Sequence, residues 1–283
     1  RQSGDMLEAA LTAGLCSVGA DVESLGVVPT PAVAYLVRKY NADAGVVISA
    51  SHNPMEFNGI KIFAGTGYKL PDEVENKIEA YIDNQCAGLK LATGDDVGRV
   101  TCRTDGIKDY TDHLYESIDG DLSGLNICID CANGASAAVA RQLFPRLGAK
   151  CTFIGVEPDG KNINAGVGST HLDNLEKAVV EGGFDCGIAF DGDADRCLAC
   201  DEKGQEIDGD KVIALLAMNM KEKGCLDGNT AVVTVMSNLG FIKFMESQGI
   251  RTEKTAVGDR YVLENMRENG YAIGGEQSGH VIL

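Results

Sequence analysis

The sequence predicts an α/β protein of several domains, and three observations support this fold class. A stretch with helical spacing, a glycine and a β-rich run recur as one unit, which is typical of right-handed α/β folds. The 283 residues, 44% of them hydrophobic, are enough for more than one core. Polar, glycine-containing segments interrupt the units, as domain linkers do. We therefore expect several α/β domains of related build rather than a solenoid.

The individual elements follow the same helix-then-strand order along the chain. Helices with their strands are expected at residues 6–16 with 22–28, 139–147 with 151–154, 172–181 with 185–190, and 241–248 with 251–257. Further strands are expected at residues 125–131 and 197–200, and a long apolar helix at 211–223. The apolar run 45–48 indicates a buried parallel strand.

Two polar segments indicate where the domains meet. Residues 88–105 are rich in glycine and charge, and the turn-rich residues 201–210 precede the long apolar helix. These segments predict a first domain over residues 1–98, a second over 99–204 and a third over 205–283.

Composition excludes several partners and favours one compartment. A formal net charge of −17 would repel nucleic acid and anionic membranes, so neither is expected as a partner. No apolar run approaches the length of a membrane span. Ten cysteines without a dense framework favour thiols in a reducing cytoplasm. The pairs Cys128/Cys131 and Cys197/Cys200 lie in strand-like runs and are expected to be small buried hydrophobic residues rather than zinc ligands.

The first loop with chemical potential is Ser49-Ala50-Ser51-His52-Asn53-Pro54, directly after the apolar run 45–48. Open α/β sheets bind ligands at the carboxyl ends of their strands, so this hairpin-like segment is well placed for catalysis. A polar turn that happens to contain a serine is the alternative. A Ser-His-Asp triad is disfavoured, since no G-x-S-x-G elbow surrounds either serine.

The second loop is Asp191-Gly192-Asp193-Ala194-Asp195-Arg196, again directly after an apolar strand. In an extended loop, carboxylates at alternating positions share one side and can converge on a hard cation such as magnesium, calcium or manganese. An EF-hand is the obvious alternative, with Glu202 at position 12, but Arg196 stands where that loop requires glycine. A solvated acidic turn is less favoured, because clustered carboxylates repel one another without a cation.

The third loop is Gly274-Gly275-Glu276-Gln277-Ser278-Gly279-His280. Its glycines let a ligand approach the backbone, and its polar side chains suit sugar hydroxyls, although a glycine-rich turn explains the pattern equally well. Val257-Gly258-Asp259-Arg260 is similarly polar and similarly ambiguous.

Taken together, the three loops in this order resemble the α-D-phosphohexomutase family. The resemblance covers nearly the whole chain and is most specific at residues 49–61, 191–196 and 275–280. The wording Glu276-Gln277-Ser278-Gly279-His280 and the segment 29–35 are closest to members that act on glucosamine phosphate. The family fold implied is a row of tandem α/β domains, with mixed sheets sandwiched by helices.

The resemblance also implies an activity and a set of roles. Ser51 would carry phosphate and donate it to a phosphosugar, giving a sugar 1,6-bisphosphate that returns its other phosphate. The net reaction would interconvert glucosamine 6-phosphate and glucosamine 1-phosphate, a step that feeds UDP-N-acetylglucosamine and cell-wall synthesis. The catalytic residues would be Ser51, His52, Lys61 and Arg196, the Mg²⁺ ligands Ser51, Asp191, Asp193 and Asp195, and the substrate-binding residues Gly258, Asp259, Glu276, Ser278 and His280.

Some expectations concern departures from the family and alternatives to it. Family members carry a fourth domain and an upstream glycine-rich segment that are absent from these 283 residues, and a homodimer is possible. Ala194 stands where many relatives have glycine, which matters if that residue needs a positive φ. The alternatives are a mutase of mannose or glucose phosphates, a non-catalytic sugar-phosphate-binding relative and a metal-dependent phosphatase.

Overall fold

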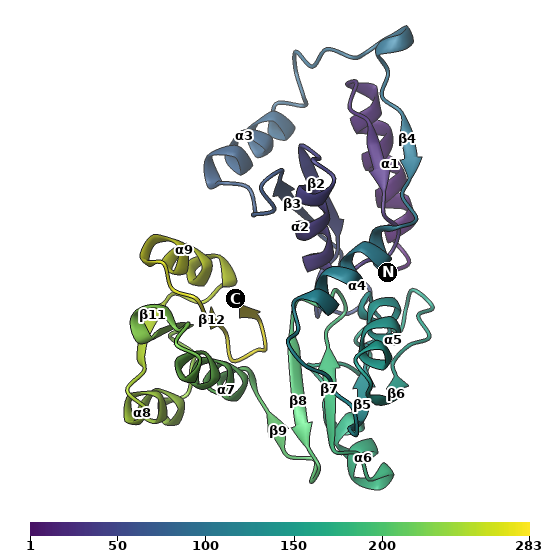
Figure 1. Ribbon diagram of the computed structural model, residues 1–283. Helices are drawn as coiled ribbons and strands as arrows, with labels where there is room; N and C mark the ends of the chain where they lie inside the picture. Colours follow the sequence, from purple (N-terminus) through teal and green to yellow (C-terminus); the bar gives the residue numbers. More distant parts are fainter.

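The computed structural model describes residues 1–283 as three α/β units arranged around the middle of the molecule. The first unit forms the upper part of Figure 1, the second lies below it, and the third lies to one side, joined to the second through the strands of residues 197–201 and 206–207. The predicted fold class is confirmed, because helices cover both faces of mixed sheets in the second and third units. No helix is long and apolar enough to cross a membrane.

Nine α-helices make up the helical layers. They are α1 (Gly4–Ser17), α2 (Thr30–Lys39), α3 (Asp72–Asp83), α4 (Gly106–Glu116), α5 (Ser136–Arg146), α6 (Asp173–Gly182), α7 (Gly209–Glu222), α8 (Leu239–Ser247) and α9 (Asp259–Asn269). The predicted helices correspond to α1, α5, α6, α7 and α8. The sequence reading missed α2, α3, α4 and α9.

Thirteen strands form four sheets. They are β1 (Val22–Ser24), β2 (Ala44–Ile48), β3 (Ile60–Ala64), β4 (Val100–Cys102), β5 (Asn126–Asp130), β6 (Lys150–Ile154), β7 (Cys186–Phe190), β8 (Cys197–Asp201), β9 (Glu206–Ile207), β10 (Thr230–Thr234), β11 (Arg251–Thr255), β12 (Gly274–Gly275) and β13 (Val281–Ile282). The strand orders are β1-β4, β2-β3, β6-β5-β7-β8-β9 and β11-β10-β12-β13. The two-stranded sheets belong to the first unit, the five-stranded sheet to the second unit and the four-stranded sheet to the third unit.

The second unit shows how strand alternation builds a three-layer sandwich. Successive side chains of a strand point to opposite faces of a sheet. Ile127 and Ile129 of β5 therefore pack toward α5, while Cys128 between them packs toward Leu175 and Val179 of α6. Cys128, Cys131 and Cys200 are all fully buried in these two clusters, which confirms that they serve as small hydrophobic residues. This sheet holds the aspartate loop between β7 and β8.

The third unit repeats the arrangement around β10. Ala231 and Val233 pack toward α7 and α8, and Val232 packs on the other face toward Val262 and Met266 of α9. All three β10 side chains are fully buried. Helices cover both faces of this sheet. The polar loop between β12 and β13 lies at the edge of the sheet, next to β8.

In the first unit, the prediction of a parallel strand before the serine loop is wrong. β2 pairs with β3 in antiparallel register, with Ile48 opposite Ile60. An apolar run reports burial but not the direction of the neighbouring strand, so periodicity alone does not distinguish the two pairings. The antiparallel pairing makes the serine loop the turn of a hairpin, as its hairpin-like appearance indicates.

Candidate active site

The serine loop lies at the turn of the β2–β3 hairpin and is fixed by its own hydrogen bonds. The Ser49 N–H donates to the Gly59 carbonyl at 2.9 Å, and the Ser51 N–H donates to Ser49 Oγ, also at 2.9 Å. Ser51 has a φ of 50°, in the left-handed region that non-glycine residues seldom adopt. Such a conformation persists when surrounding contacts hold it, and it often marks a functional position.

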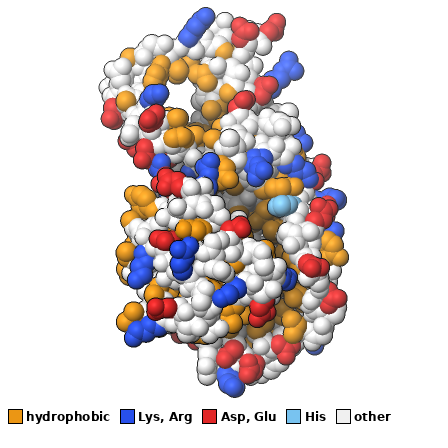
Figure 2. Space-filling model, turned by 60° about the vertical axis from the view of Figure 1, so that its left-hand side comes forward, with side chains coloured by type: hydrophobic (Ala, Val, Ile, Leu, Met, Phe, Trp, Pro, Cys, Tyr) orange, Lys and Arg blue, Asp and Glu red, His pale blue; other side chains and the backbone are white.

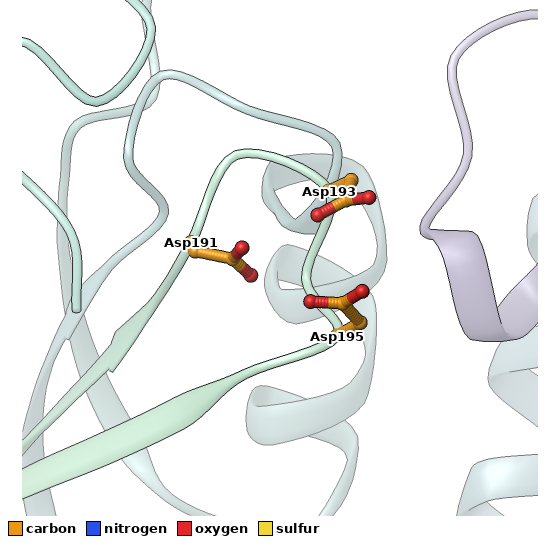
Figure 3. A group of neighbouring side chains, drawn as sticks. All are labelled: Asp191, Asp193 and Asp195. Atoms are coloured by element: carbon orange, nitrogen blue, oxygen red, sulfur yellow. The ribbon is translucent and has the colours of Figure 1, made fainter. Parts of the chain in front are cut away.

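The aspartate loop is the turn between β7 and β8. The sequence reading attributed convergence of its carboxylates to an extended backbone, but here the chain turns through Ala194, whose φ is 57°. The positive φ that the alanine was expected to tolerate poorly is therefore present, at a cost of about 1 kcal/mol relative to glycine. Figure 3 shows the resulting arrangement, with the carboxylates of Asp191, Asp193 and Asp195 facing a common space.

The two loops meet directly, although they are 140 positions apart in sequence. Ser51 Oγ donates to Asp191 Oδ2 at 2.7 Å. The ammonium group of Lys61, on β3, donates to Asp193 Oδ2 at 2.6 Å and to Asp195 Oδ2 at 3.0 Å. The aspartate loop therefore unites two hydrogen-bonded groups in one network of site residues, Ser51 with Asp191 and Lys61 with Asp193 and Asp195, and Lys61 provides a cation beside the carboxylates.

The aspartate loop has the features of a divalent-cation site. One oxygen from each of the three carboxylates lies within 4.8 Å of the others. Asp193 Oδ1 and Asp195 Oδ1 are buried and have no hydrogen-bond partner. A buried carboxylate oxygen without a partner is costly, and an oxygen-only donor set is the kind that Mg²⁺ prefers. The residues present therefore fit a magnesium ion.

Burial and charge distribute the proton affinities of this network unevenly. Burial, together with the charges of Asp193 and Asp195, raises the pKa of Asp191 to about 7. Burial also acts to raise the pKa of Asp193, but Lys61 and Thr30 outweigh it and hold that pKa below its usual range. Asp191 is thus the carboxylate to which Lys61 donates no hydrogen bond, and a bound cation would lower its pKa by favouring the ionised form.

The remaining predicted catalytic residues lie close to the network. His52 is half-buried, and its pKa is lowered by burial and by the positive charge of Arg196. The Arg196 N–H donates to Asp191 Oδ1 at 3.1 Å, while its guanidinium forms no ion pair. Because the guanidinium is not paired with a carboxylate, it is available to bind an anion such as phosphate.

The predicted sugar-binding residues form a second group on the third unit. The Gly258 N–H donates to Glu276 Oε1 at 3.0 Å, and His280 Nε2 lies 3.6 Å from Asp259 Oδ2. Ser278 is half-buried in the same loop, and its side chain forms no hydrogen bond. No hydrogen bond or ion pair joins these side chains to Ser51 or to the aspartate triad, so the two predicted groups form separate sets.

Backbone contacts nevertheless tie the loop of residues 274–280, called the sugar loop after its predicted role, to β8, the strand that follows the aspartate loop. The Cys197 N–H on β8 donates to the Gly279 carbonyl at 3.0 Å, and the Gly209 N–H on α7 donates to the Gln277 carbonyl at 2.9 Å. A Cβ on Gly209 would lie 2.1 Å from the Glu276 carbonyl oxygen. Only glycine fits at that position, so the loop is seated closely on α7.

The first and third units also meet through charged side chains. Lys69 Nζ lies 2.6 Å from Asp259 Oδ2, and Arg260 pairs with Asp72 and Glu75 on α3. Figure 2 shows acidic and basic side chains interspersed around the hollow between the upper part of the molecule and the rest. These ion pairs are the most direct link between the sugar-binding side and the unit that carries Ser51.

Three residues that were not predicted contact the serine loop or the aspartate loop. Thr30, the first residue of α2, donates from Oγ1 to Asp193 Oδ2 at 2.7 Å and from its N–H to the Asp193 carbonyl at 2.8 Å. Arg1 and Asn164 both donate to the Ser51 carbonyl. Only Thr30 had a signal in the sequence, a polar residue between two prolines where a helix begins, since a helix N-terminus favours a nearby carboxylate.

Models of three consecutive domains match this chain. They describe α/β/α domains I, II and III of phosphoglucomutase/phosphomannomutase, and they match residues 1–87, 108–204 and 208–283 respectively. A solved structure of a phosphoglucomutase/phosphomannomutase family protein from Burkholderia thailandensis has a TM-score of 0.83 to this chain at 26% identity. It covers 99% of this chain and 61% of its own.

Two curated relatives are closer in sequence. The phosphoglucosamine mutases of Acetivibrio thermocellus and Clostridium tetani are each 57% identical to this chain over 283 residues. The alignments cover 100% of this chain and 63% of each relative. The chain thus spans somewhat less than two thirds of the length of the curated relatives that it matches.

Proposed function

We propose, because the chain belongs to the phosphoglucomutase/phosphomannomutase family, that the whole protein interconverts glucosamine 6-phosphate and glucosamine 1-phosphate through a phosphorylated Ser51. The observation that carries the proposal is the 2.7 Å hydrogen bond from Ser51 Oγ to Asp191, which places the serine hydroxyl at the edge of a magnesium-type site. The choice of sugar rests on the relatives at 57% identity, which are named phosphoglucosamine mutases.

In the proposed reaction, phosphoserine 51 donates its phosphoryl group to the free hydroxyl of the sugar phosphate. The Oγ–P bond breaks as a new O–P bond forms, the hydroxyl proton leaves to a base, and Ser51 Oγ ends as the acceptor for the second half. The resulting sugar 1,6-bisphosphate reorients and returns its other phosphoryl group to Ser51. The oxygen that it leaves takes up a proton, so the net reaction is an isomerisation.

Each of the side chains near Ser51 has a defined task in this scheme. Asp191, Asp193, Asp195 and a phosphoserine oxygen would hold Mg²⁺, which supplies positive charge against the phosphoryl oxygens. Lys61 is already held at the site by two carboxylates, and its pKa is raised by them despite burial, so it stays charged. Arg196 provides the free guanidinium. Phosphoryl transfer depends mainly on such positioning and charge neutralisation.

The sugar side of the proposal assigns binding to Gly258, Asp259, Glu276, Ser278 and His280. Support comes from the close packing of the loop of residues 274–280 on α7 and on β8, the strand that follows the aspartate loop. Buried backbone contacts hold the loop in one conformation. A fixed loop presents the same polar groups to the sugar in both orientations of the bisphosphate. A cytoplasmic location is consistent with ten free thiols, and a homodimer remains a prediction.

The experiment compares full-length protein on three substrates, namely the 6-phosphates of glucosamine, mannose and glucose. Each is supplied with Mg²⁺ and a catalytic amount of sugar 1,6-bisphosphate, and formation of the 1-phosphate is followed. We expect the highest kcat/KM for glucosamine 6-phosphate. A higher value for mannose or glucose phosphate would move the assignment to the other mutases of the family, and release of free phosphate without isomerisation would indicate a phosphatase.

A further inference from the structure

Two backbone carbonyls of the serine loop share the same pair of hydrogen-bond donors. Arg1 Nη2 donates to the Ser51 carbonyl at 2.8 Å and to the Asn53 carbonyl at 2.9 Å. Asn164 Nδ2, from the second unit, donates to the same two oxygens at 2.9 Å and 3.3 Å. The loop is thus held from its own unit by a guanidinium and from the neighbouring unit by an amide.

The backbone at Ser51 needs such contacts. Its positive φ is unfavourable for any residue with a Cβ, and the internal bonds of the loop satisfy N–H groups but leave the Ser51 and Asn53 carbonyls without partners from the loop itself. Without outside donors, a more extended conformation would satisfy these oxygens with water. The Oγ atom would then move away from Asp191, because the direction of a side chain follows from its backbone dihedrals.

Asn164 is built into the second unit rather than lying loosely on its surface. It is 5% exposed, its N–H donates to the Ala132 carbonyl at 3.0 Å, and its own φ is 57°. A Cβ on Gly192, in the aspartate loop, would lie 2.8 Å from Asn164 Nδ2. The amide of Asn164 therefore packs against the backbone of one reacting loop while it donates to the other.

We propose that Asn164 is a positioning residue for phosphoryl transfer, which fixes the left-handed turn of Ser51 against the aspartate loop so that Oγ faces the cation site. It acts through the Ser51 and Asn53 carbonyls and touches no reacting atom. The proposal rests on the function assigned above to Ser51, and it adds a residue outside the three predicted loops. It assigns to Asn164 an effect on the transfer step rather than on binding of sugar or metal.

The test replaces Asn164 with glycine and compares it with the same change at Asn133. Glycine removes the amide but accepts a positive φ, so backbone strain does not confuse the result. Asn133 is a matched control, because its φ is 49° and its Nδ2 donates to a carbonyl of the second unit, that of Asn162 at 3.3 Å. Asn164→Asp is the second variant, since it keeps the side-chain shape while replacing the donor with an acceptor.

Two measurements are made on full-length protein. Hydrogen exchange of the peptide that covers residues 49–57 reports the loop itself, whether or not the protein is active. Incorporation of phosphate at Ser51 from a sugar 1,6-bisphosphate reports the transfer. Asn164→Gly should exchange about tenfold faster in this peptide and take up phosphate about 10- to 100-fold more slowly, with KM and Mg²⁺ affinity unchanged. Asn133→Gly should match the wild type in both measurements.

The outcomes separate this proposal from the function on which it rests. Unchanged exchange in Asn164→Gly and Asn164→Asp, or equal phosphate uptake in the Asn164 and Asn133 variants, overturns the positioning role. A lower melting temperature alone, with the wild-type rate of phosphate uptake, also overturns it, because that is the result of a purely structural contact. If exchange accelerates as expected but even the wild type takes up no phosphate, the loop contact stands and the mutase assignment fails.

Discussion

The unit that carries Ser51 touches its two neighbours in different ways. Against the second unit it uses buried, short hydrogen bonds, such as Thr30 to Asp193, a carboxylate whose side chain is 5% exposed. Against the third unit its exposed side chains form ion pairs with half-buried partners, such as Asp72, which is 72% exposed, with Arg260. Buried contacts fix geometry, whereas exposed ion pairs are weak and screened by salt. The contrast indicates that the proposed phosphoryl-transfer centre is preformed and that the proposed sugar-binding side is free to adjust.

The largest expected effect comes from a substitution at the proposed cation site, where the first and second units make their buried contacts. Asp193→Asn should weaken Mg²⁺ binding by about 100-fold or more, since even groups behind a metal ligand are worth about 10- to 100-fold. Calorimetric titration of Mg²⁺ measures it. Glu202→Gln is the matched control, because it removes one negative charge just beyond β8 at the position that an EF-hand would require. Equal loss in both variants would contradict the assignment of the site to the aspartate loop.

The stability of the protein and the Mg²⁺ affinity of the aspartate loop should both depend on pH. Folding raises the pKa of Asp191 from an ordinary 3.8 to about 7 in the metal-free protein. A group with a raised folded pKa contributes stability below its unfolded pKa and loses that contribution as pH rises through the folded value. The metal-free protein should therefore lose stability as the pH rises from the unfolded value of 3.8 to about 7, and this loss should level off above that pH. The apparent Mg²⁺ affinity should rise by up to about tenfold per pH unit below 7 and then level off.

Thermal unfolding with and without Mg²⁺ across this range measures both parts of the pH prediction. The stabilisation by Mg²⁺ should grow as pH rises, because the cation replaces the proton that Asp191 has lost. A pH-independent Mg²⁺ effect would contradict the idea that proton and cation compete for the same carboxylates.

A smaller effect is expected where the sugar loop is seated on α7. Gly209→Ala places a Cβ against the Glu276 carbonyl, so the loop must shift, at a cost of about 1–3 kcal/mol of stability. We expect KM for the sugar phosphate to rise more than kcat falls. Gly4→Ala is the control, because Gly4 is also the first residue of a helix and nothing lies within 4 Å of its added Cβ. Steady-state kinetics that show similar KM values for both variants would contradict this seating.

The smallest effect should come from the ion pairs between the first and third units. Lys69→Met removes the pair with Asp259 and should change stability by no more than about 1 kcal/mol. Any change in KM should disappear at about 0.5 M salt, where such pairs are screened in the wild type as well. Lys77→Met, on the exposed face of α3, is the control. A salt-independent loss of activity in Lys69→Met would show that this side is as rigid as the other.

The sequence was most informative where chemistry follows a buried strand directly. The aspartate and serine loops were located because an apolar run precedes a cluster of polar residues, and their order carried the resemblance to a family. Their contact could not be predicted from either loop, because Ser51 and Asp191 are brought together by packing between two units. Arg1 and Asn164 gave no signal for the same reason, since each acts on a backbone carbonyl that is distant in sequence.

The helices that were missed show a second limit. α3, α4 and α9 have helical apolar spacing, but they are more polar overall than each of the five helices that were predicted. α4 buries Gly106, Tyr110 and Thr111, two of which are not hydrophobic markers of a helix. A sequence prediction that starts from apolar stretches passes over such polar helices, although their helical spacing is present.

The most direct test of the account is peptide mass spectrometry of full-length protein before and after incubation with a sugar 1,6-bisphosphate and Mg²⁺. The account predicts a gain of one phosphate, located on Ser51 and abolished in Ser51→Ala, with Ser49→Ala still accepting phosphate at Ser51. Phosphate on another residue, or no phosphate in a wild-type protein that binds Mg²⁺, would contradict the claim that Ser51 and the aspartate loop form a phosphoryl-transfer centre.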